Sequence, residues 1–158
     1  EDDMELLRRE VKGIQRISPE FSKWGSTVRL GDKINQPNVT GMIPEYGIMR
    51  NIWPEPGGRF INDLDNQYRR RVAFLGNRLR DFLFGEKADA IGKYIYIDET
   101  PFLVIGVMRE KTQPSSYNQR DRDRVFIPMT THKAMFGYTY VSNFIYQIYD
   151  PKFIAENL

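Results

Sequence analysis

The clearest alternation of apolar and polar positions lies in Ile91–Met108, where the chain reads I-G-K-Y-I-Y-I-D-E-T-P-F-L-V-I-G-V-M. Ile95 and Ile97 alternate with tyrosines, which places the isoleucines on one face of a strand and the tyrosines on the other. A polar break at 98–101 separates this strand from a denser apolar run, 102–107, that is typical of a buried return strand. The pattern predicts a β-hairpin over 91–108 that carries no reactive group and forms the core of the scaffold.

Two residues of the return strand have a special backbone role. Pro101 has no N–H to donate to a sheet, so we expect it at the turn or at the first position of the strand. Gly106, between two β-branched residues, predicts either a β-bulge or a close approach by another part of the backbone.

The rest of the chain predicts short helices and strands. Helical spacing or helix-ending residues indicate helices at 2–12, 77–84, 129–136 and from 150 onward, and a short helix or turn at 43–51. In helix 77–84 we expect Leu79, Phe82 and Leu83 on one face, and Thr130 or Thr131 could cap helix 129–136. Further strands are predicted at 14–17, 24–30, 34–42, 71–76, 124–128 and 144–149.

Composition is that of a globular protein. The 158 residues are 41% hydrophobic and 28% charged, which suits one domain with room for a small inserted lobe. A net charge of +2 is too small to indicate nucleic-acid binding, and the cluster Arg69–Arg71 is expected to be an exposed start of a strand.

The residue types needed for catalysis or metal binding are scarce. The absence of cysteine excludes disulfides, thiol catalysis and cysteine-bound zinc. The single histidine, His132, has no surrounding catalytic motif and is expected to be a surface or capping residue. Asp121 and Asp123 lack the glycine and distal glutamate of a calcium loop. Asp63 and Asp65 are expected to cap a turn at Leu64, so no catalytic or metal-binding residue is predicted.

The strand, glycine and helix at 71–84 have a faint likeness to a phosphate-binding turn. The segment lacks both G-x-G-x-x-G and the G-K-[ST] ending, so no nucleotide or other cofactor is predicted.

Residues 111–124 read K-T-Q-P-S-S-Y-N-Q-R-D-R-D-R, a polar run longer than most connections in compact domains. Tyrosine and arginine are the residue types that most often anchor protein interfaces. We therefore predict that Tyr117, Arg120 and Arg122 contact a protein partner. The alternative is a surface loop without a partner, because mixed charge with Ser, Gln and Asn is also the composition of plain disorder.

The chain is expected to be part of a longer protein. It begins at Glu1 without methionine and stops at Leu158 inside a predicted helix. Its longest apolar run is the return strand of the hairpin, far shorter than the ~18 residues that a membrane helix requires.

Six motifs in a fixed order give the chain a resemblance to a known family. They are V-T-G-M-I-P-E-Y (39–46), G-G-R-F-I-N-D-L-D (57–65), R-V-A-F-L-G-N-R-L-R-D-F-L-F-G (71–85), I-G-K-Y-I-Y-I (91–97), P-F-L-V-I-G-V-M (101–108) and V-F-I-P-M (125–129). Together they resemble the extracytoplasmic core domain of MacB-type ABC transporter permeases, over about Leu6 to Tyr149. One departure is Arg80-Asp81, at positions where small residues are common in the family.

The resemblance implies an α+β fold with mixed sheets. A porter-like lobe with βαβ units would comprise residues 1–42 and, truncated, 137–158. Residues 43–136 would form a smaller inserted mixed α/β lobe that contains hairpin 91–108.

The resemblance also implies a role without catalysis. The domain would lie on the periplasmic face of the bacterial inner membrane, anchored by one membrane helix before it and three after it. It would couple ATP-driven motion of those helices to export or release of a substrate. Implied partners are a second permease in a homodimer or heterodimer, a cytoplasmic ATPase, and a periplasmic adaptor or outer-membrane protein. A free-standing periplasmic ligand- or protein-binding module is the alternative.

Overall fold

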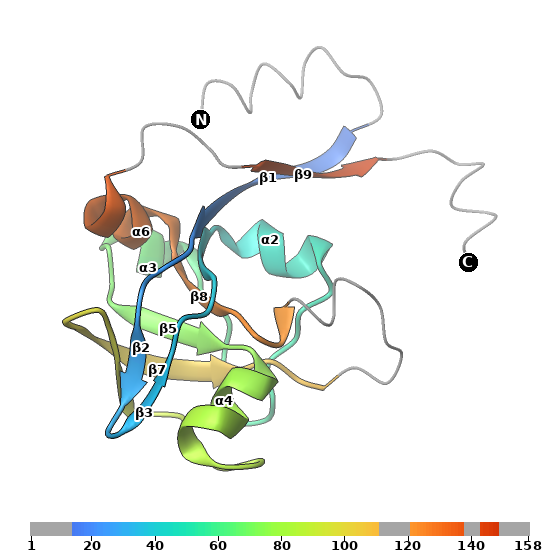
Figure 1. Ribbon diagram of the computed structural model, residues 1–158. Helices are drawn as coiled ribbons and strands as arrows, with labels where there is room; N and C mark the ends of the chain where they lie inside the picture. Colours follow the sequence, from blue (N-terminus) through green and yellow to red (C-terminus); the bar gives the residue numbers. More distant parts are fainter. Residues whose placement is uncertain (1–13, 111–120, 138–142, 149–158) are drawn as a thin grey trace.

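The computed structural model describes residues 14–110, 121–137 and 143–148 (Figure 1). The strands within these ranges are β1 Ile14–Lys23, β2 Val28–Leu30, β3 Lys33–Asn35, β4 Val39–Met42, β5 Val72–Leu75, β6 Tyr94–Ile97, β7 Thr100–Val107, β8 Val125–Pro128 and β9 Asn143–Ile148. The helices are α2 Pro44–Met49, α3 Asp63–Gln67, α4 Asn77–Phe84 and α6 Met129–Phe136.

All of these strands belong to one mixed sheet in the order β3-β2-β6-β7-β5-β8-β4-β1-β9. Two neighbouring pairs are parallel, β5 with β7 and β4 with β8, and the other pairs are antiparallel. With its helices, the sheet confirms the predicted α+β class.

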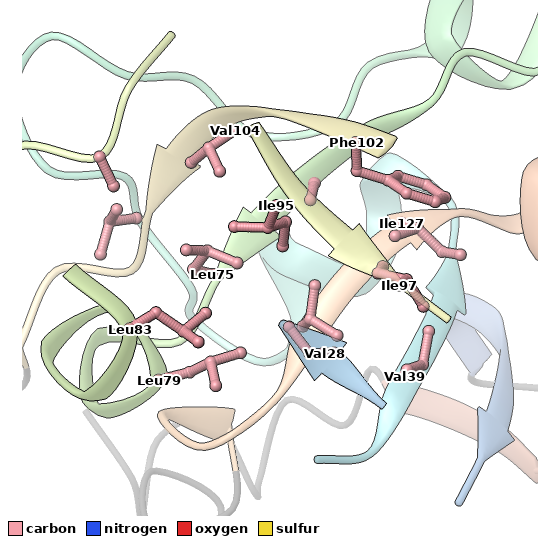
Figure 2. Close-up of a cluster of buried hydrophobic side chains, with 14 residues drawn as sticks. Val28, Val39, Leu75, Leu79, Leu83, Ile95, Ile97, Phe102, Val104 and Ile127 are labelled. Carbon is pink, nitrogen blue, oxygen red and sulfur yellow. The ribbon is translucent and has the colours of Figure 1, made fainter. Parts of the chain in front are cut away.

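The two faces of the sheet bury separate apolar cores. On one face, Leu79 and Leu83 of α4 pack against Val28, Ile95 and Ile97 from β2 and β6 (Figure 2). On the other face, the segment containing α2 contributes Tyr46, Ile52 and Ile61 to a cluster with Phe74 and Phe126. The sheet is therefore a middle layer between α4 and the chain around α2.

The predicted hairpin is confirmed as β6 and β7, paired antiparallel. Ile95 and Ile97 are fully buried, while Tyr94 and Tyr96 are exposed, as the alternation predicts. Both expectations for Gly106 hold. The register between β5 and β7 shifts beside it, and a Cβ atom at Gly106 would lie only 2.3 Å from the carbonyl oxygen of Arg59.

Helices α4 and α6 have the predicted bounds, but two details of the prediction are wrong. Phe82 is 43% exposed, because the face of α4 that meets the sheet is defined by Leu79 and Leu83. The residue at the N-terminal cap of α6 is Pro128, without a side-chain hydrogen bond. The hydroxyls of Thr130 and Thr131 instead bond to the carbonyl oxygens of Asn66 and Arg70.

The predicted strands near the start of the chain need correction. The run 34–42 is interrupted at 36–38, where Pro37 cannot donate to a ladder, so it splits into β3 and β4. Strand β1 does not stop at Ser18 but continues through Pro19 to Lys23. Proline has no N–H to donate to a ladder, and it is tolerated here because Pro19 has a neighbouring strand on one side only. It pairs with β9, whereas pairing with β4 begins at Phe21.

Strand β1 changes partner along its length, from β9 at 14–20 to β4 at 21–23. The predicted association of the strand near Phe144 with the start of the chain is therefore present as the β1–β9 pair. The division into lobes at 42 and 136 stays a prediction, since the same continuous sheet includes strands from both sides of each boundary. The predicted helices at 2–12 and from 150 lie outside the described residues.

Helix α3 begins at a capping box. The side chain of Asn62 accepts a hydrogen bond from the backbone N–H of Asp65, and the carboxylate of Asp65 accepts one from that of Asn62. Of the two acids predicted to cap this turn, Asp65 does so, and it also bonds to Arg59 and Arg70. Among the described helices, none has the length and apolar composition needed to cross a membrane.

Candidate functional site: a buried network of charges

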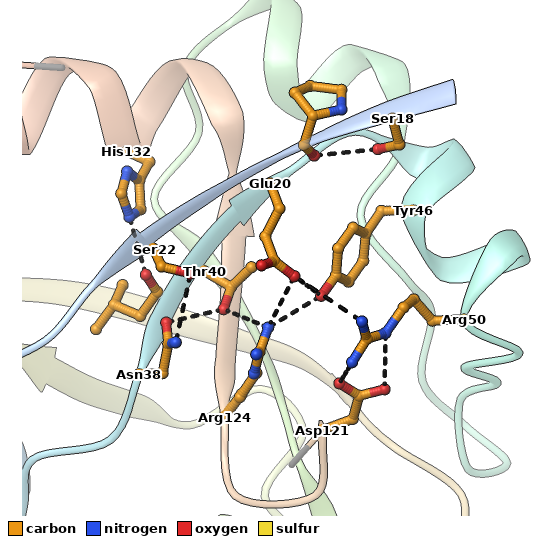
Figure 3. Close-up of polar contacts among 12 residues, drawn as sticks. Ser18, Glu20, Ser22, Asn38, Thr40, Tyr46, Arg50, Asp121, Arg124 and His132 are labelled. Atoms are coloured by element: carbon orange, nitrogen blue, oxygen red, sulfur yellow. Dashed lines mark hydrogen bonds and ion pairs between the residues drawn. The ribbon is translucent and has the colours of Figure 1, made fainter. Parts of the chain in front are cut away.

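Four charged side chains and one tyrosine from distant parts of the chain meet beside β1 and β4 (Figure 3). They are Glu20 of β1, Tyr46 of α2, Arg50 at the end of α2, and Asp121 and Arg124 just before β8. None is more than 7% exposed. Charged residues are rarely buried unless they are paired, so this group is the most unusual polar feature of the described fold.

Local structure brings the two members from α2 together. Helix α2 starts with Pro44 in its first turn, where a missing N–H costs nothing. Tyr46 and Arg50 are four residues apart, which places both on one face of the helix. The guanidinium carbon of Arg50 lies 5.4 Å from the centre of the Tyr46 ring.

The first half of the network is centred on Glu20. The hydroxyl of Tyr46 donates a hydrogen bond to Glu20 Oε2 at 2.6 Å, and Arg124 Nη1 donates to the same oxygen at 3.1 Å. Arg124 Nη1 also lies 3.0 Å from the tyrosine oxygen and 3.4 Å from Thr40 Oγ1. One carboxylate oxygen therefore joins β1, α2 and the start of β8.

The second half is a bidentate ion pair between Arg50 and Asp121. Arg50 Nη2 donates to Asp121 Oδ1 at 2.6 Å and Nε donates to Oδ2 at 3.3 Å. Arg50 Nη1 lies 4.0 Å from Glu20 Oε2, so the two halves are in electrostatic contact. Two carboxylates and two guanidinium groups cancel in charge, and this pairing offsets part of the cost of removing them from water.

The electrostatics keep these groups in fixed protonation states. Burial alone would raise the pKa of Glu20, but the hydrogen bond from Tyr46 and the charge of Arg124 outweigh it and hold the pKa below its ordinary value. Burial raises the pKa of Tyr46, so its hydroxyl stays protonated and remains a donor. The arrangement contains no activated nucleophile; it holds three chain segments together, namely β1, α2 and the residues before β8.

His132 is fully buried, and the prediction of a surface or capping residue is wrong. Helix α6 packs against β4 so closely that a Cβ atom at Gly41 would lie 2.5 Å from His132 Cβ. The ring nitrogen Nε2 is 2.9 Å from the carbonyl oxygen of Val39, and the rings of Phe21 and Phe136 are neighbours. Burial lowers the pKa of His132 to about 4.

This lowered pKa predicts a pH-dependent stability. Between pH 6.5 and about 4 the unfolded chain binds a proton on His132 that the folded chain does not, so the stabilisation present above pH 6.5 is lost as the pH falls. The expected loss is about 3 kcal/mol over this window. Urea unfolding at stepped pH values measures it, and His132→Gln should remove this part of the pH dependence. Since the chain has one histidine, its imidazole proton resonance is unambiguous, and a folded-state pKa above 6 in NMR would contradict the assignment.

The turn at Gly76 is closed to phosphate. The amides of Arg78 and Leu79, which open α4, donate to the carbonyl oxygen of Arg122 at 2.9 and 3.2 Å. A Cβ atom at Gly76 would lie 2.3 Å from the backbone of Arg122. These two amides of the first turn of α4 are therefore already bonded to the chain.

A pocket of about 370 Å³ beside α4 includes Glu55, Arg80, Lys87 and Asp89 in its lining. Arg80 is 4% exposed and binds Glu55 through a fork at 2.9 and 3.1 Å. This pairing explains how the charged guanidinium of Arg80 can be buried. With two acidic and two basic residues, the lining favours neither a cation nor an anion, so we assign the pocket no ligand.

The predicted partner-binding residues are not brought together by the described structure. Tyr117 and Arg120 lie outside the described residues, and Arg122 is half-buried with its carbonyl bonded to α4. Their role stays a prediction. One part of the loop prediction is wrong, because Asp121 and Arg124 are buried in the network instead of lying in a solvated loop.

Sequence reasoning missed the network because its members are far apart in the chain. Arg124 and Glu20 are separated by 104 residues, and Arg50 and Asp121 by 71. No periodicity links such positions. The available signal was weak, a charged residue directly before the buried strand β8.

The chain matches a family model over residues 1–152, and the family is described as MacB-like periplasmic core domain. It is 35% identical over 98% of its length to the macrolide export ATP-binding/permease protein MacB of Bdellovibrio bacteriovorus. It is 32% identical over 81% of its length to the pyoverdine export ATP-binding/permease protein PvdT of Pseudomonas syringae pv. syringae. The chain spans 23% and 18% of the lengths of these two proteins.

Two solved structures have the same fold. The extracellular domain of the ABC-type transporter YknZ from Gram-positive bacteria matches with a TM-score of 0.77 at 22% identity, over 99% of this chain and 76% of that one. The periplasmic region of MacB from Actinobacillus actinomycetemcomitans matches with a TM-score of 0.75 at 20% identity, over 99% of this chain and 68% of that one.

Proposed function

The chain belongs to the family of MacB-like periplasmic core domains, and from this premise we propose that it transmits ATP-driven motion of a permease's membrane helices to an export step outside the membrane. The domain itself performs no reaction in this proposal. Its relatives are named for the export of macrolides and of pyoverdine, so outward transport is the direction proposed here.

The observation that carries the proposal is the pairing of β1 with β9. These are the first and last described strands, and they form one antiparallel ladder at one end of the molecule (Figure 1). Strand β1 then continues into the main sheet beside β4, and Glu20 ties it to α2 and to the chain before β8. A displacement that enters at β1 and β9 would therefore reach the body of the domain through the backbone ladder and the buried contacts of Glu20.

The proposed partners follow from this role. The permease would pair with a second permease, be driven by a cytoplasmic ATPase fused or separate, and meet an adaptor or outer-membrane protein on the outside. The contact with that outside protein is assigned to Tyr117, Arg120 and Arg122.

The partner assignment is tested in the full-length transporter. Replacing Tyr117, Arg120 and Arg122 together by alanine should reduce export by about tenfold or more, because tyrosine and arginine are enriched among the few interface residues whose loss costs about 2 kcal/mol or more. ATPase activity in detergent and the thermal stability of the domain should not change. Export of a macrolide and of pyoverdine are the first assays.

The matched control uses exposed residues of the same types elsewhere, Tyr68→Ala with Arg78→Ala. Unchanged export in the triple variant would contradict the partner assignment and favour the alternative, a surface loop without a partner. A fall in thermal stability large enough to explain the loss of export would lead to the same conclusion.

A further inference from the structure

One part of the sheet presents aromatic and apolar side chains and one arginine to solvent. This surface is called the outer face and consists of Arg29, Ile34, Tyr94, Tyr96 and Pro101. The strand register places Ile34 opposite Arg29, Arg29 opposite Tyr96, and Tyr96 opposite Pro101. Because directly paired residues point to the same side of a sheet, these side chains form a continuous row across β3, β2, β6 and β7. Tyr94, two positions from Tyr96, adds to the same side.

The composition of the outer face is unusual for a solvated sheet. The opposite side of these strands is covered by α4, which packs on Val28, Ile95 and Ile97 (Figure 2). An antiparallel sheet with one buried face normally carries polar residues on its other face. Here Ile34 is 56% exposed, Tyr94 57% and Tyr96 37%. Neighbouring exposed apolar residues of this kind mark interaction sites.

The outer face carries a positive charge without an acidic partner. The guanidinium carbon of Arg29 lies 4.7 Å from the centre of the Tyr96 ring. Among the described residues, no salt bridge or side-chain hydrogen bond involves this guanidinium. A partner that complements this surface would therefore supply a carboxylate surrounded by apolar side chains.

The position of the outer face favours a protein, and not a membrane, as its binding partner. The β2–β3 hairpin lies at the end of the molecule opposite the β1–β9 ladder (Figure 1). If the ends of the chain lead to membrane helices, as the proposed function holds, the outer face lies at the end of the domain far from the inner membrane. Tyrosine, arginine and isoleucine on a rigid sheet are also suited to a protein interface, where aromatic residues and arginine dominate the binding energy.

We propose that the outer face docks an extracytoplasmic protein that places an acidic side chain on Arg29 and apolar side chains on Ile34, Tyr94 and Tyr96. This surface is distinct from Tyr117, Arg120 and Arg122, and only its distance from the membrane rests on the proposed function. Arg29 would act through charge and through its stacking on Tyr96, so lysine should replace it only in part.

The test is photo-crosslinking in living cells that express the full-length transporter. A photoreactive amino acid replaces Tyr94 and, as the matched control, Tyr68, which is 61% exposed. We expect a protein adduct at position 94, none of the same mass at position 68, and a loss of about tenfold in the adduct with Arg29→Glu. Arg29→Lys should retain part of the yield. Circular dichroism of the 158-residue chain must show equal melting for all variants.

The decisive step is a charge exchange. Mass spectrometry of the adduct identifies the partner peptide, and changing its nearest acidic residue to lysine should restore the adduct with Arg29→Glu. An adduct that survives Arg29→Glu, an adduct with lipid or with a second copy of this chain, or the absence of any adduct would each overturn the proposal. The readout does not depend on export, so failure of the proposed coupling role would leave the adduct unchanged.

Discussion

Arg124→Met is expected to lower the free energy of unfolding by about 3–5 kcal/mol, because it leaves the carboxylate of Glu20 buried without its charge partner. Glu20 is 6% exposed, so water cannot easily replace the lost guanidinium. The hydroxyl of Tyr46 would remain as a donor, and Arg50, at 4.0 Å, would remain as the nearest positive charge. Chemical denaturation of the 158-residue chain measures the effect.

Two further variants separate charge from packing. Arg78→Met removes an arginine that is 61% exposed and should change stability by no more than about 0.5 kcal/mol. The double variant Glu20→Gln with Arg124→Met removes both charges, so it should be more stable than Arg124→Met by about 1 kcal/mol or more. If Arg124→Met and Arg78→Met have equal denaturation midpoints, the network does not hold the fold together.

Ile105→Ala is expected to cost about 2–5 kcal/mol, a large share of the ~5–15 kcal/mol that stabilises a typical domain. Ile105 lies in β7, is 8% exposed, and belongs to the cluster that contains Phe74 and Phe126. The bulge beside Gly106 fixes the backbone here, so the cavity left by the smaller side chain would not readily collapse.

The matched control for this prediction is Ile34→Ala. Ile34 is in the edge strand β3 and is 56% exposed, so the same chemical change should cost no more than about 0.5 kcal/mol. The denaturant midpoints of the two alanine variants are compared, and the midpoint of Ile105→Ala should be clearly the lower. Similar, mild effects would show that β7 is not central to stability.

The sequence predicts those parts of the fold that depend on neighbouring residues. The alternation around Ile95 and Ile97 defines which side of β6 is buried, and this holds in the structure. Helices α4 and α6 have the predicted bounds because their flanking residues, Gly85 and Pro128, act locally. The break between β3 and β4 is also local, because Pro37 has no N–H to donate to a ladder.

The parts that the sequence did not predict depend on tertiary contacts. The burial of His132 follows from the approach of α6 to Gly41, and the exposure of Phe82 follows from the direction in which α4 meets the sheet. The charge network is the extreme case, since Asp121 and Arg124 are part of a polar run that has the composition of a loop. Only the folded chain shows that their carboxylate and guanidinium groups have buried partners.

The ladder between β1 and β9 also has a consequence for the order of folding. Its pairs run from Ile14 with Ile148 to Glu20 with Asn143. The first described strand in the sequence therefore cannot complete its pairing until the last one is available. Contacts so distant in sequence are entropically expensive to form and slow down folding. When the chain emerges from a translocation channel with its N-terminus first, β5 to β8 can pair while β1 still has only β4 as a partner. The ladder should therefore be the last part of the sheet to gain protection from hydrogen exchange during refolding.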